Sequence, residues 1–339
     1  MSITRKRRST GKVTLADVAQ LAGVGTMTVS RALRTPEAVS DKLREKIEAA
    51  VQELGYVPNL AASALASASS WTIAMVVPHL SEFGCSEMFA GLQQVLQPAG
   101  YQIMLAESQH QPEQEEKLLE TLLASNIAAA VLLSVEHSEN VRNWLQNASI
   151  PVMEIGAVRA DPIDMNIGID HAAAMFELTE MLITRGYQNI GLLCANQEKW
   201  VFQQHLQGWY KAMLRHHRSP DRVINAASSP TFSTGAAQLP EFLLAWPELD
   251  ALVCESDELA CGVLYECQRR RIKVPEDLAV VGFGDSDVSR VCQPPLTTMA
   301  VPHRKIGADA GKALLARLSD NDWSPKATIT SRLCQRDSC

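Results

Sequence analysis

The spacing of apolar residues changes character twice along the 339-residue chain. Within residues 14–54, apolar side chains recur at helical intervals, which predicts two short helices joined by a tight turn at Gly23 and a third helix over about 41–54. Residues 61–69 are Ala and Ser apart from Leu65, so this run has little to bury and predicts a linker that folds against a partner. From Trp71 onward, short apolar strands alternate with amphipathic helices.

That alternation predicts parallel sheets covered by helices on both faces. Two such series of similar length follow each other, and they predict two doubly wound lobes. The final segment, 296–339, carries one strand, one helix over about 303–318 and a terminal strand, which we expect to cross back and complete both lobes. The predicted organisation is a helical head over 1–58, a linker over 59–70 and an α/β body over 71–339, in which lobe 1 takes about 71–160 and 303–324, and lobe 2 takes about 161–300 and the C-terminal strand.

Charge separates the head from the body. Residues 1–60 hold ten Lys/Arg and six Asp/Glu, a net charge of +4, so the remainder carries −11 of the total of −7. A basic head on an acidic body indicates that only the head meets nucleic-acid phosphates. Arg5, Lys6, Arg7 and Arg8 lie in an N-terminal arm that either contacts phosphates or is a solvated tail.

Several classes of protein are disfavoured. None of the eight cysteines forms a CxxC pair, so we expect free thiols and no metal site. No apolar run reaches 18 residues, and the basic N-terminus precedes no apolar segment, so we expect a cytoplasmic protein without a membrane span or secretory signal. No GxGxxG follows the first strand, and no P-loop or GxSxG occurs, so we expect neither an enzyme nor a cofactor.

Three stretches together resemble the LacI/GalR family of bacterial transcriptional regulators: TLADVAQLAGVGTMTVSRAL, REKIEAAVQELGYVPNLAASALAS and DELACGVLYECQRRRIKVPEDLAVVGFGDSD. The resemblance covers essentially the whole chain. It implies an all-α helix-turn-helix head, a hinge helix and a periplasmic-binding-protein-like body that forms a homodimer and binds a small molecule between its lobes. The phrases GYQIMLAES, SNIAAAVLLSVEHS and IPVMEIG are most like regulators of gluconate and related sugar-acid use.

For the head, the resemblance implies that the second helix enters the DNA major groove. Arg31 can offer two donors to a guanine edge, and Met27 can contact a thymine methyl group or be a half-buried packing residue. Gly25 stands where relatives usually carry a capping serine, and Leu60 where they often carry arginine. The residues expected to contact bases are Thr26, Met27 and Arg31; those expected at phosphates are Thr14, Thr28, Ser30 and Asn59; and Leu65 is expected to wedge into the minor groove.

For the body, the resemblance implies an effector site at the carboxyl ends of the strands, between the lobes. His205 stands where relatives carry arginine or lysine, and it is either an anion contact, in which case acidification should raise affinity, or a hydrogen-bonded surface histidine. Asp257 either bonds ligand hydroxyls or caps a helix. Gly284 stands where some relatives carry an acidic residue, and the missing carboxylate suits an anionic sugar. Glu82 and Glu154 disfavour an anionic sugar unless they bind its hydroxyl groups. The full expected set is Pro78, Glu82, Ser134, Glu154, His205, Phe232, Ser256, Asp257, Gly284 and His303.

These features predict a repressor that a sugar acid such as gluconate controls. An activator or dual regulator of the same fold, or a regulator that responds to a neutral or phosphorylated sugar, stays open, and a sugar-transport protein is the least favoured reading. A two-fold symmetric dimer predicts a palindromic operator and association with the nucleoid when bound to DNA.

Overall fold

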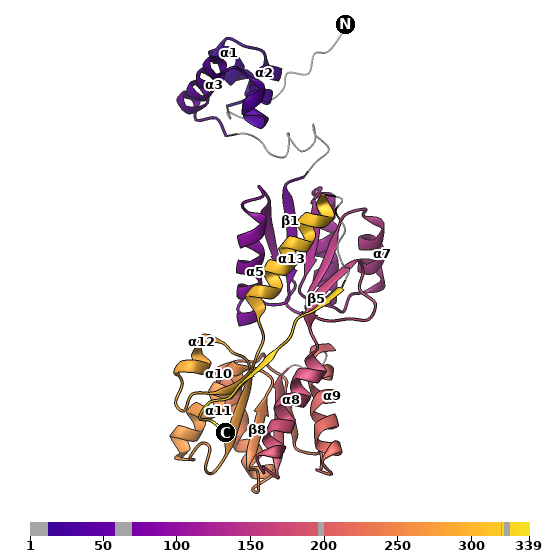
Figure 1. The fold of residues 1–339 in the computed structure, drawn as a ribbon, viewed down its shortest axis with the longest axis vertical. Coiled ribbons are helices and arrows are strands. Elements are labelled where there is room, and N and C mark those ends of the chain that lie inside the picture. Colours follow the sequence, from indigo (N-terminus) through magenta and orange to yellow (C-terminus); the bar gives the residue numbers. More distant parts are fainter. Residues whose placement is uncertain (1–12, 58–69, 196–199, 320, 322–325) are drawn as a thin grey trace. The chain divides into compact units, whose positions relative to one another are not determined.

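The computed structural model describes residues 13–57, 70–195, 200–319, 321 and 326–339. The chain divides into two compact units, residues 1–69 and residues 70–339 (Figure 1). The predicted linker over 59–70 and its residues Asn59 and Leu65 lie outside the described part, except for Ser70. We describe the head and the body in turn.

The head is three helices around one small core. Thr14 closes a capping box with Asp17, and Gly23, with φ of 65°, ends the first helix in the left-handed conformation that glycine adopts without strain. Val18, Val29 and Ile47 are almost wholly buried between the helices. The helices are α1 (Leu15–Ala22), α2 (Thr26–Arg34) and α3 (Asp41–Leu54), with a 3₁₀ turn at Pro36–Ala38.

Lobe 1 of the body is a six-stranded sheet with helices on both faces. Its strand order is β11-β5-β4-β3-β1-β2. Helices α5 and α13 cover one face and α6 and α7 the other. Gly91 and Gly307 let α5 and α13 approach so closely that a Cβ at either would meet a backbone oxygen at 2.0 or 1.9 Å. The strands are β1 (Thr72–Val77), β2 (Gln102–Glu107), β3 (Ala129–Leu132), β4 (Val152–Ala157), β5 (Met165–Ile169) and β11 (Lys326–Thr328); the helices are α5 (Phe83–Leu96), α6 (Pro112–Ala124), α7 (Glu139–Asn147) and α13 (His303–Leu318).

Lobe 2 repeats this plan with a different edge. Its strand order is β12-β10-β9-β8-β6-β7, and β12 runs antiparallel to β10, whereas the other pairs are parallel. The strands are β6 (Ile190–Ala195), β7 (Val223–Ala226), β8 (Ala251–Cys254), β9 (Ala279–Gly284), β10 (Thr297–Ala300) and β12 (Arg332–Cys334); the helices are α8 (His171–Thr184), α9 (Trp200–Arg215), α10 (Phe232–Ala245), α11 (Asp257–Arg270) and α12 (Asp287–Val291).

The chain crosses between the lobes three times, after β5, after β10 and between β11 and β12 (Figure 1). The predicted boundary at about residue 160 is wrong, because β5 pairs with β4 and with β11 in lobe 1. The strand β11 was also not predicted: it is three residues long, with alternating exposed and half-buried side chains that give no apolar run. The predicted terminal strand of lobe 2 is β12, which pairs with β10.

The described part of the chain has no helix long and apolar enough to cross a membrane. All eight cysteines are free thiols, and six of them are buried. No group of three or more potential metal ligands occurs among the described residues.

Candidate DNA-reading helix and effector cleft

Helix α2 presents an exposed face. Thr26, Met27 and Arg31 are exposed, and Met27 leaves 78% of its surface open, which contradicts the alternative that it is a packing residue. Thr28 and Ser30 are half-buried. The face therefore combines a hydroxyl, a thioether and a guanidinium, which are groups able to contact base edges.

The start of α2 departs from the usual cap. Gly25 is its N-cap residue, with φ of −77° and ψ of 152°, and no side chain accepts the free N–H groups of the first turn. A Cβ at Gly25 would come no closer than 4.0 Å to the Thr28 hydroxyl, so a larger residue fits. At α1 the corresponding hydroxyl is committed, because Thr14 Oγ1 donates to Asp17 Oδ2 at 2.7 Å.

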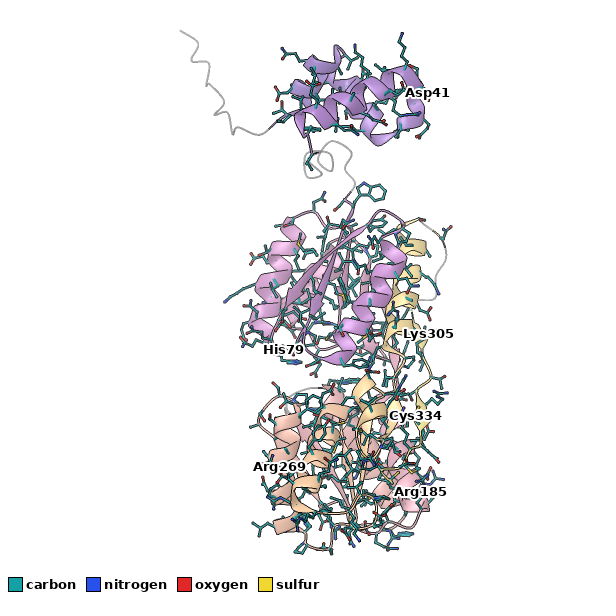
Figure 2. The ribbon with its side chains drawn as sticks, turned by 90° about the vertical axis from the view of Figure 1, so that its left-hand side faces the viewer. Asp41, His79, Arg185, Arg269, Lys305 and Cys334 are labelled. Carbon is teal, nitrogen blue, oxygen red and sulfur yellow. The ribbon has the colours of Figure 1, made fainter. Side chains whose placement is uncertain are left out.

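Several expected effector residues of lobe 1 lie where β1 and β3 end. Pro78 follows β1, and Glu82 Oε1 bonds His110 Nε2 at 2.9 Å. Figure 2 shows His79 at the edge of lobe 1 that faces lobe 2. Ser134 Oγ follows β3 and is turned onto its own loop, donating to the Glu136 carbonyl at 3.1 Å. The Glu136 carboxylate accepts from Trp200 N at 3.0 Å, so the same loop reaches the first turn of α9 in lobe 2.

Glu154 is a wrong prediction. Its side chain is wholly buried on the α6/α7 side of β4, where its Oε2 accepts from Ile163 N at 2.7 Å and its Oε1 lies 3.6 Å from His137 Nε2. His137 Nδ1 bonds Glu115 Oε2 at 3.0 Å. Burial lowers the pKa of His137, but these two carboxylates outweigh it and raise that pKa to about 9. Strand alternation thus directs Glu154 into a buried ion cluster, away from the cleft.

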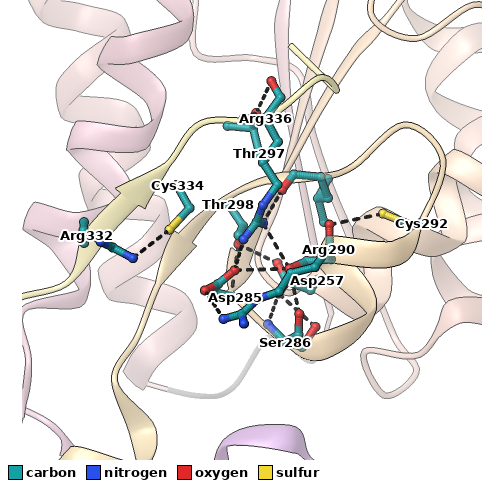
Figure 3. A network of polar contacts seen from close by, with 12 residues as sticks. Asp257, Asp285, Ser286, Arg290, Cys292, Thr297, Thr298, Arg332, Cys334 and Arg336 are labelled. Carbon is teal, nitrogen blue, oxygen red and sulfur yellow. Dashed lines mark hydrogen bonds and ion pairs between the residues drawn. The ribbon is translucent and has the colours of Figure 1, made fainter.

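Asp257 organises the loop between β9 and β10. Ser256 is the residue that caps α11, accepting from Leu259 N at 3.2 Å. The buried Asp257 carboxylate accepts from Ser286 N (2.6 Å), Ser286 Oγ (2.9 Å) and Thr298 Oγ1 (2.6 Å), as Figure 3 shows. Burial raises the pKa of Asp257, and these hydrogen bonds oppose that rise. Neither alternative in the sequence prediction, a helix cap or a ligand contact, describes these bonds.

Gly284 is required by backbone geometry. Its φ is 134°, and a Cβ there would face Asp257 Oδ2 at 3.5 Å, so an acidic residue would be strained and would set two carboxylates side by side. The next residue, Asp285, is bound by Arg290 and by Arg336 from the C-terminal tail (Figure 3). These ion pairs outweigh burial and lower the pKa of Asp285.

His205 is buried rather than on the surface. It is 3% exposed, its Nε2 lies 3.0 Å from His171 Nδ1, and its ring packs against Phe283 at 4.7 Å. Burial lowers the pKa of His205 to about 3, so the ring is neutral at physiological pH. The structure therefore does not support a permanent cation at this position.

His303 stands at the start of α13, with its ring edge-on to Phe83 at 5.8 Å. Burial, and then the charge of His171, lower its pKa to about 4, and its Nδ1 has no hydrogen-bond partner. Phe232, by contrast, stays 42% exposed and contacts Tyr265, with ring centroids 6.3 Å apart. His171, His205 and His303 thus lie in one cluster, and Phe232 packs outside it.

Sequence reasoning missed His171, Glu255 and His137. The first two follow β5 and β8, at the strand ends where ligand sites form, and this position was the available signal. His137 had no such signal, because its partner Glu115 comes from α6 and Glu154 from β4.

Comparison with known proteins agrees with this architecture. A family model described as bacterial regulatory proteins, lacI family, matches residues 14–59, and a periplasmic binding protein-like domain matches residues 179–339. The HTH-type transcriptional regulator GntR of Escherichia coli K12 is 36% identical over 313 residues, covering 92% of this chain and 94% of that protein. The regulator IdnR of the same strain is 30% identical, covering 92% and 93%.

Solved structures extend the similarity to the whole fold. A LacI family regulator from Silicibacter pomeroyi superposes with a TM-score of 0.90 at 29% identity, covering 96% of this chain and 99% of that one. The lac repressor dimer bound to operator and an anti-inducer gives a TM-score of 0.85 at 25% identity, covering 96% and 99%. These relatives are transcriptional regulators, and the lac repressor structure is a dimer that holds operator DNA and a small molecule. The chain belongs to the LacI family of bacterial transcriptional regulators and is a repressor with an effector-binding body.

Proposed function

We propose that this repressor is controlled by a sugar acid of the gluconate class, bound between the two lobes and releasing the operator. The observation that carries this proposal is the similarity to GntR of Escherichia coli and of Pseudomonas aeruginosa, at 36% and 31% identity over more than nine-tenths of the chain. IdnR supports the same class. CytR of Escherichia coli, at 31% identity, is the competing relative.

In this proposal α2 reads the operator. The exposed Thr26, Met27 and Arg31 contact bases, and Arg31 contributes roughly 1–3 kcal/mol of base discrimination. Thr28, Ser30 and Asn59 contact phosphates, which set the register of the head on the duplex. Thr14 is not part of this set, because its hydroxyl and its backbone N–H both donate to Asp17 in the capping box of α1. Residues 59–70 act as a hinge whose Leu65 enters the minor groove.

The effector site of this proposal lies at the strand ends of both lobes. Glu82 and the loop of Ser134 contribute from lobe 1, and His205 and His303 line the interior. Asp257 shapes the site through Ser286 and Thr298 rather than by touching the ligand. The remaining members are Pro78, Phe232, Ser256 and Gly284.

A neutral polyhydroxy effector is the second candidate. Three carboxylates, those of Glu82, Glu255 and Glu258, stand at the ends of β1 and β8. The pKa of Glu258 is raised, first by burial and then by the charges of Asp257 and Glu82. Carboxylates of the two lobes therefore repel each other. Carboxylates accept bonds from hydroxyl groups and repel an anion, which favours a sugar without a carboxylate.

Operator release distinguishes the candidates. We would select a palindromic duplex from a random pool with the full-length protein, and follow its anisotropy while adding D-gluconate, 6-phosphogluconate or D-glucose. Release at the lowest concentration by D-gluconate supports the proposal. Release by D-glucose alone, or by 6-phosphogluconate alone, replaces the sugar acid with the corresponding class.

A further inference from the structure

A cavity of about 700 Å³ lies where the second and third crossings pass between the lobes. Its walls come from the start of α5, from α12 and the loop before it, from the turn between β10 and α13, and from the segment between β11 and β12. Both lobes therefore contribute to it. His303 is the one residue of the expected effector set that lines this cavity. A volume of this size is within the range of sites that bind small metabolites.

Four cationic side chains line the cavity, and all four are exposed to water. They are Arg290 on α12, Arg304 and Lys305 in the first turn of α13, and Arg332 at the start of β12. Two carboxylates line it as well, those of Glu87 and Asp285. The chain beyond residue 60 carries a net charge of −11, so this gathering of cations runs against the charge of the body as a whole.

The two carboxylates of the cavity do not balance its cations. Asp285 pairs with Arg290 at 2.9 Å, but it also pairs with Arg336, which does not line the cavity (Figure 3). Glu87 Oε2 lies 3.8 Å from Arg304 Nη1, a distance too long for a direct hydrogen bond. One carboxylate therefore serves two arginines, and the other holds its arginine only through a long ion pair.

The other two cations are compensated still less. Lys305 shares the Asp309 carboxylate with Lys312, whose Nζ lies 3.1 Å from Asp309 Oδ1. Within the described part of the chain, Arg332 forms no ion pair, and its hydrogen-bond partner is the Cys334 sulfur, 3.7 Å from Nη2 (Figure 3). A guanidinium with five N–H donors thus stands at the cavity with one weak acceptor.

The start of α13 makes this arrangement unfavourable without an anion. A helix amino terminus carries a partial positive charge, so cations in the first turn destabilise the helix. The first turn of α13 holds Arg304 and Lys305 and no acidic residue, and no side chain caps its N–H groups. An anion in the cavity offsets the charge of the helix terminus and of the cations together. A local arrangement that opposes helix preference is expected at a functional site.

We propose that this cavity binds the phosphate group of a small phosphorylated metabolite, as a second ligand site apart from the effector site. Arg304 from lobe 1 and Arg332 from lobe 2 supply guanidinium groups, whose planar fork matches phosphate oxygens. A phosphate ester carries a charge of about −2 at neutral pH, which matches the excess of four cations over two carboxylates in the lining. The volume leaves room for the rest of the metabolite. This inference does not rest on the proposed effector class.

Calorimetric titration of the full-length protein with glycerol 3-phosphate tests the site. We expect saturable binding of one molecule per chain, weakened by added salt because the cations are exposed. Inorganic phosphate should bind more weakly, and acetate, with a single charge, should give no saturable heat. Absence of saturable heat from glycerol 3-phosphate up to about 10 mM overturns the proposal. Inorganic phosphate that binds as tightly as glycerol 3-phosphate overturns the ester and makes free phosphate the ligand.

Two variants locate the bound phosphate. Arg332→Gln and Arg304→Gln should each weaken glycerol 3-phosphate binding by roughly tenfold, since each removes a charge-assisted hydrogen bond. Arg269→Gln is the matched control, because it removes the same charge from an exposed arginine on α11 that pairs with Glu266 at 3.4 Å. Urea midpoints check that all three variants fold. A loss in the control equal to that in both variants shows a general charge effect and overturns the assignment to the cavity.

Competition separates this site from the effector site. Saturating D-gluconate should leave glycerol 3-phosphate bound, whereas an apparent Kd that rises in proportion to the D-gluconate concentration places both in one site and overturns the proposal. A protein that binds glycerol 3-phosphate in an Arg332-dependent way but does not bind D-gluconate supports the second site and contradicts only the proposed effector class.

Discussion

The head and the body hold their functional side chains in opposite ways. Met27 on α2 is 78% exposed, whereas His205 on α9 is 3% exposed. On α2 the exposed Thr26, Met27 and Arg31 keep the chemistry of their residue types, because water surrounds them. In the body, partners from distant elements set the state of a buried group, as the hydrogen bonds from Ser286 and Thr298 to the Asp257 carboxylate do.

The contrast extends to proton binding, and this gives the largest expected effect. All eight histidines lie beyond residue 70, and burial lowers the pKa of His171, His205 and His303 to about 3, 3 and 4. Each of these histidines has a pKa near 6.5 in the unfolded chain. Its contribution to the free energy of unfolding is present above pH 6.5 and is lost as the pH falls towards its pKa in the folded protein. We expect the free energy of unfolding of the body to fall by up to roughly 4 kcal/mol from pH 6.5 to 5.

Urea unfolding followed by tryptophan fluorescence measures this, since all six tryptophans also lie beyond residue 70. Hydrogen exchange in residues 15–54 of the same protein is the internal control and should change little. A body whose stability is flat over this range contradicts the depressed histidine pKa values.

His137 behaves in the opposite sense. Its pKa is raised to about 9, so its contribution is present below pH 6.5 and is lost as pH rises towards 9. His137→Ala should destabilise the body by about 3–5 kcal/mol, because it leaves the Glu115 and Glu154 carboxylates buried without their cation. Urea midpoints measure the loss, with His216→Ala as the partly exposed control; a loss below about 1 kcal/mol would show that the cluster is solvated.

On the head, Arg31→Ala should weaken operator binding by about 1–3 kcal/mol, or roughly fivefold to 150-fold, without unfolding the protein. Arg44→Ala is the matched control, since Arg44 lies on α3 and pairs with Asp41 at 2.7 Å. Anisotropy on the selected duplex and on a scrambled one measures specificity. Equal losses on both duplexes would make Arg31 a phosphate contact.

Gly25→Ser gives the smallest effect. The site has N-cap geometry and room for a side chain, so a serine hydroxyl should cap α2 and stabilise the head by about 0.5 kcal/mol. Slower hydrogen exchange of the first turn of α2 is the measurement. Unchanged exchange would mean that the free N–H groups are already satisfied by water.

Most of the fold follows from local pattern, and much of the cleft does not. The apolar run 72–77 and the helix over 303–318 match β1 and α13, because the spacing of their own apolar residues shows which side chains are buried. Thr14, Gly23 and the exposed face of α2 were also predictable, because they depend on neighbours within one or two turns. Glu154 was not: its direction follows from strand alternation, but its partners His137 and Ile163 come from loops outside β4. The strand β11 lacks an apolar run and exists only through pairing with β5.

The three crossings have a consequence for the order in which the protein is made. Lobe 1 needs α13 and β11, and lobe 2 needs β12, so neither sheet is complete until the ribosome has translated residues 326–334. The head, by contrast, holds all its core within residues 15–56 and can fold as soon as that stretch leaves the exit tunnel. A nascent chain therefore carries a finished DNA-reading head long before it has a finished body, and control by the effector begins only after residues 326–334 have joined the two sheets.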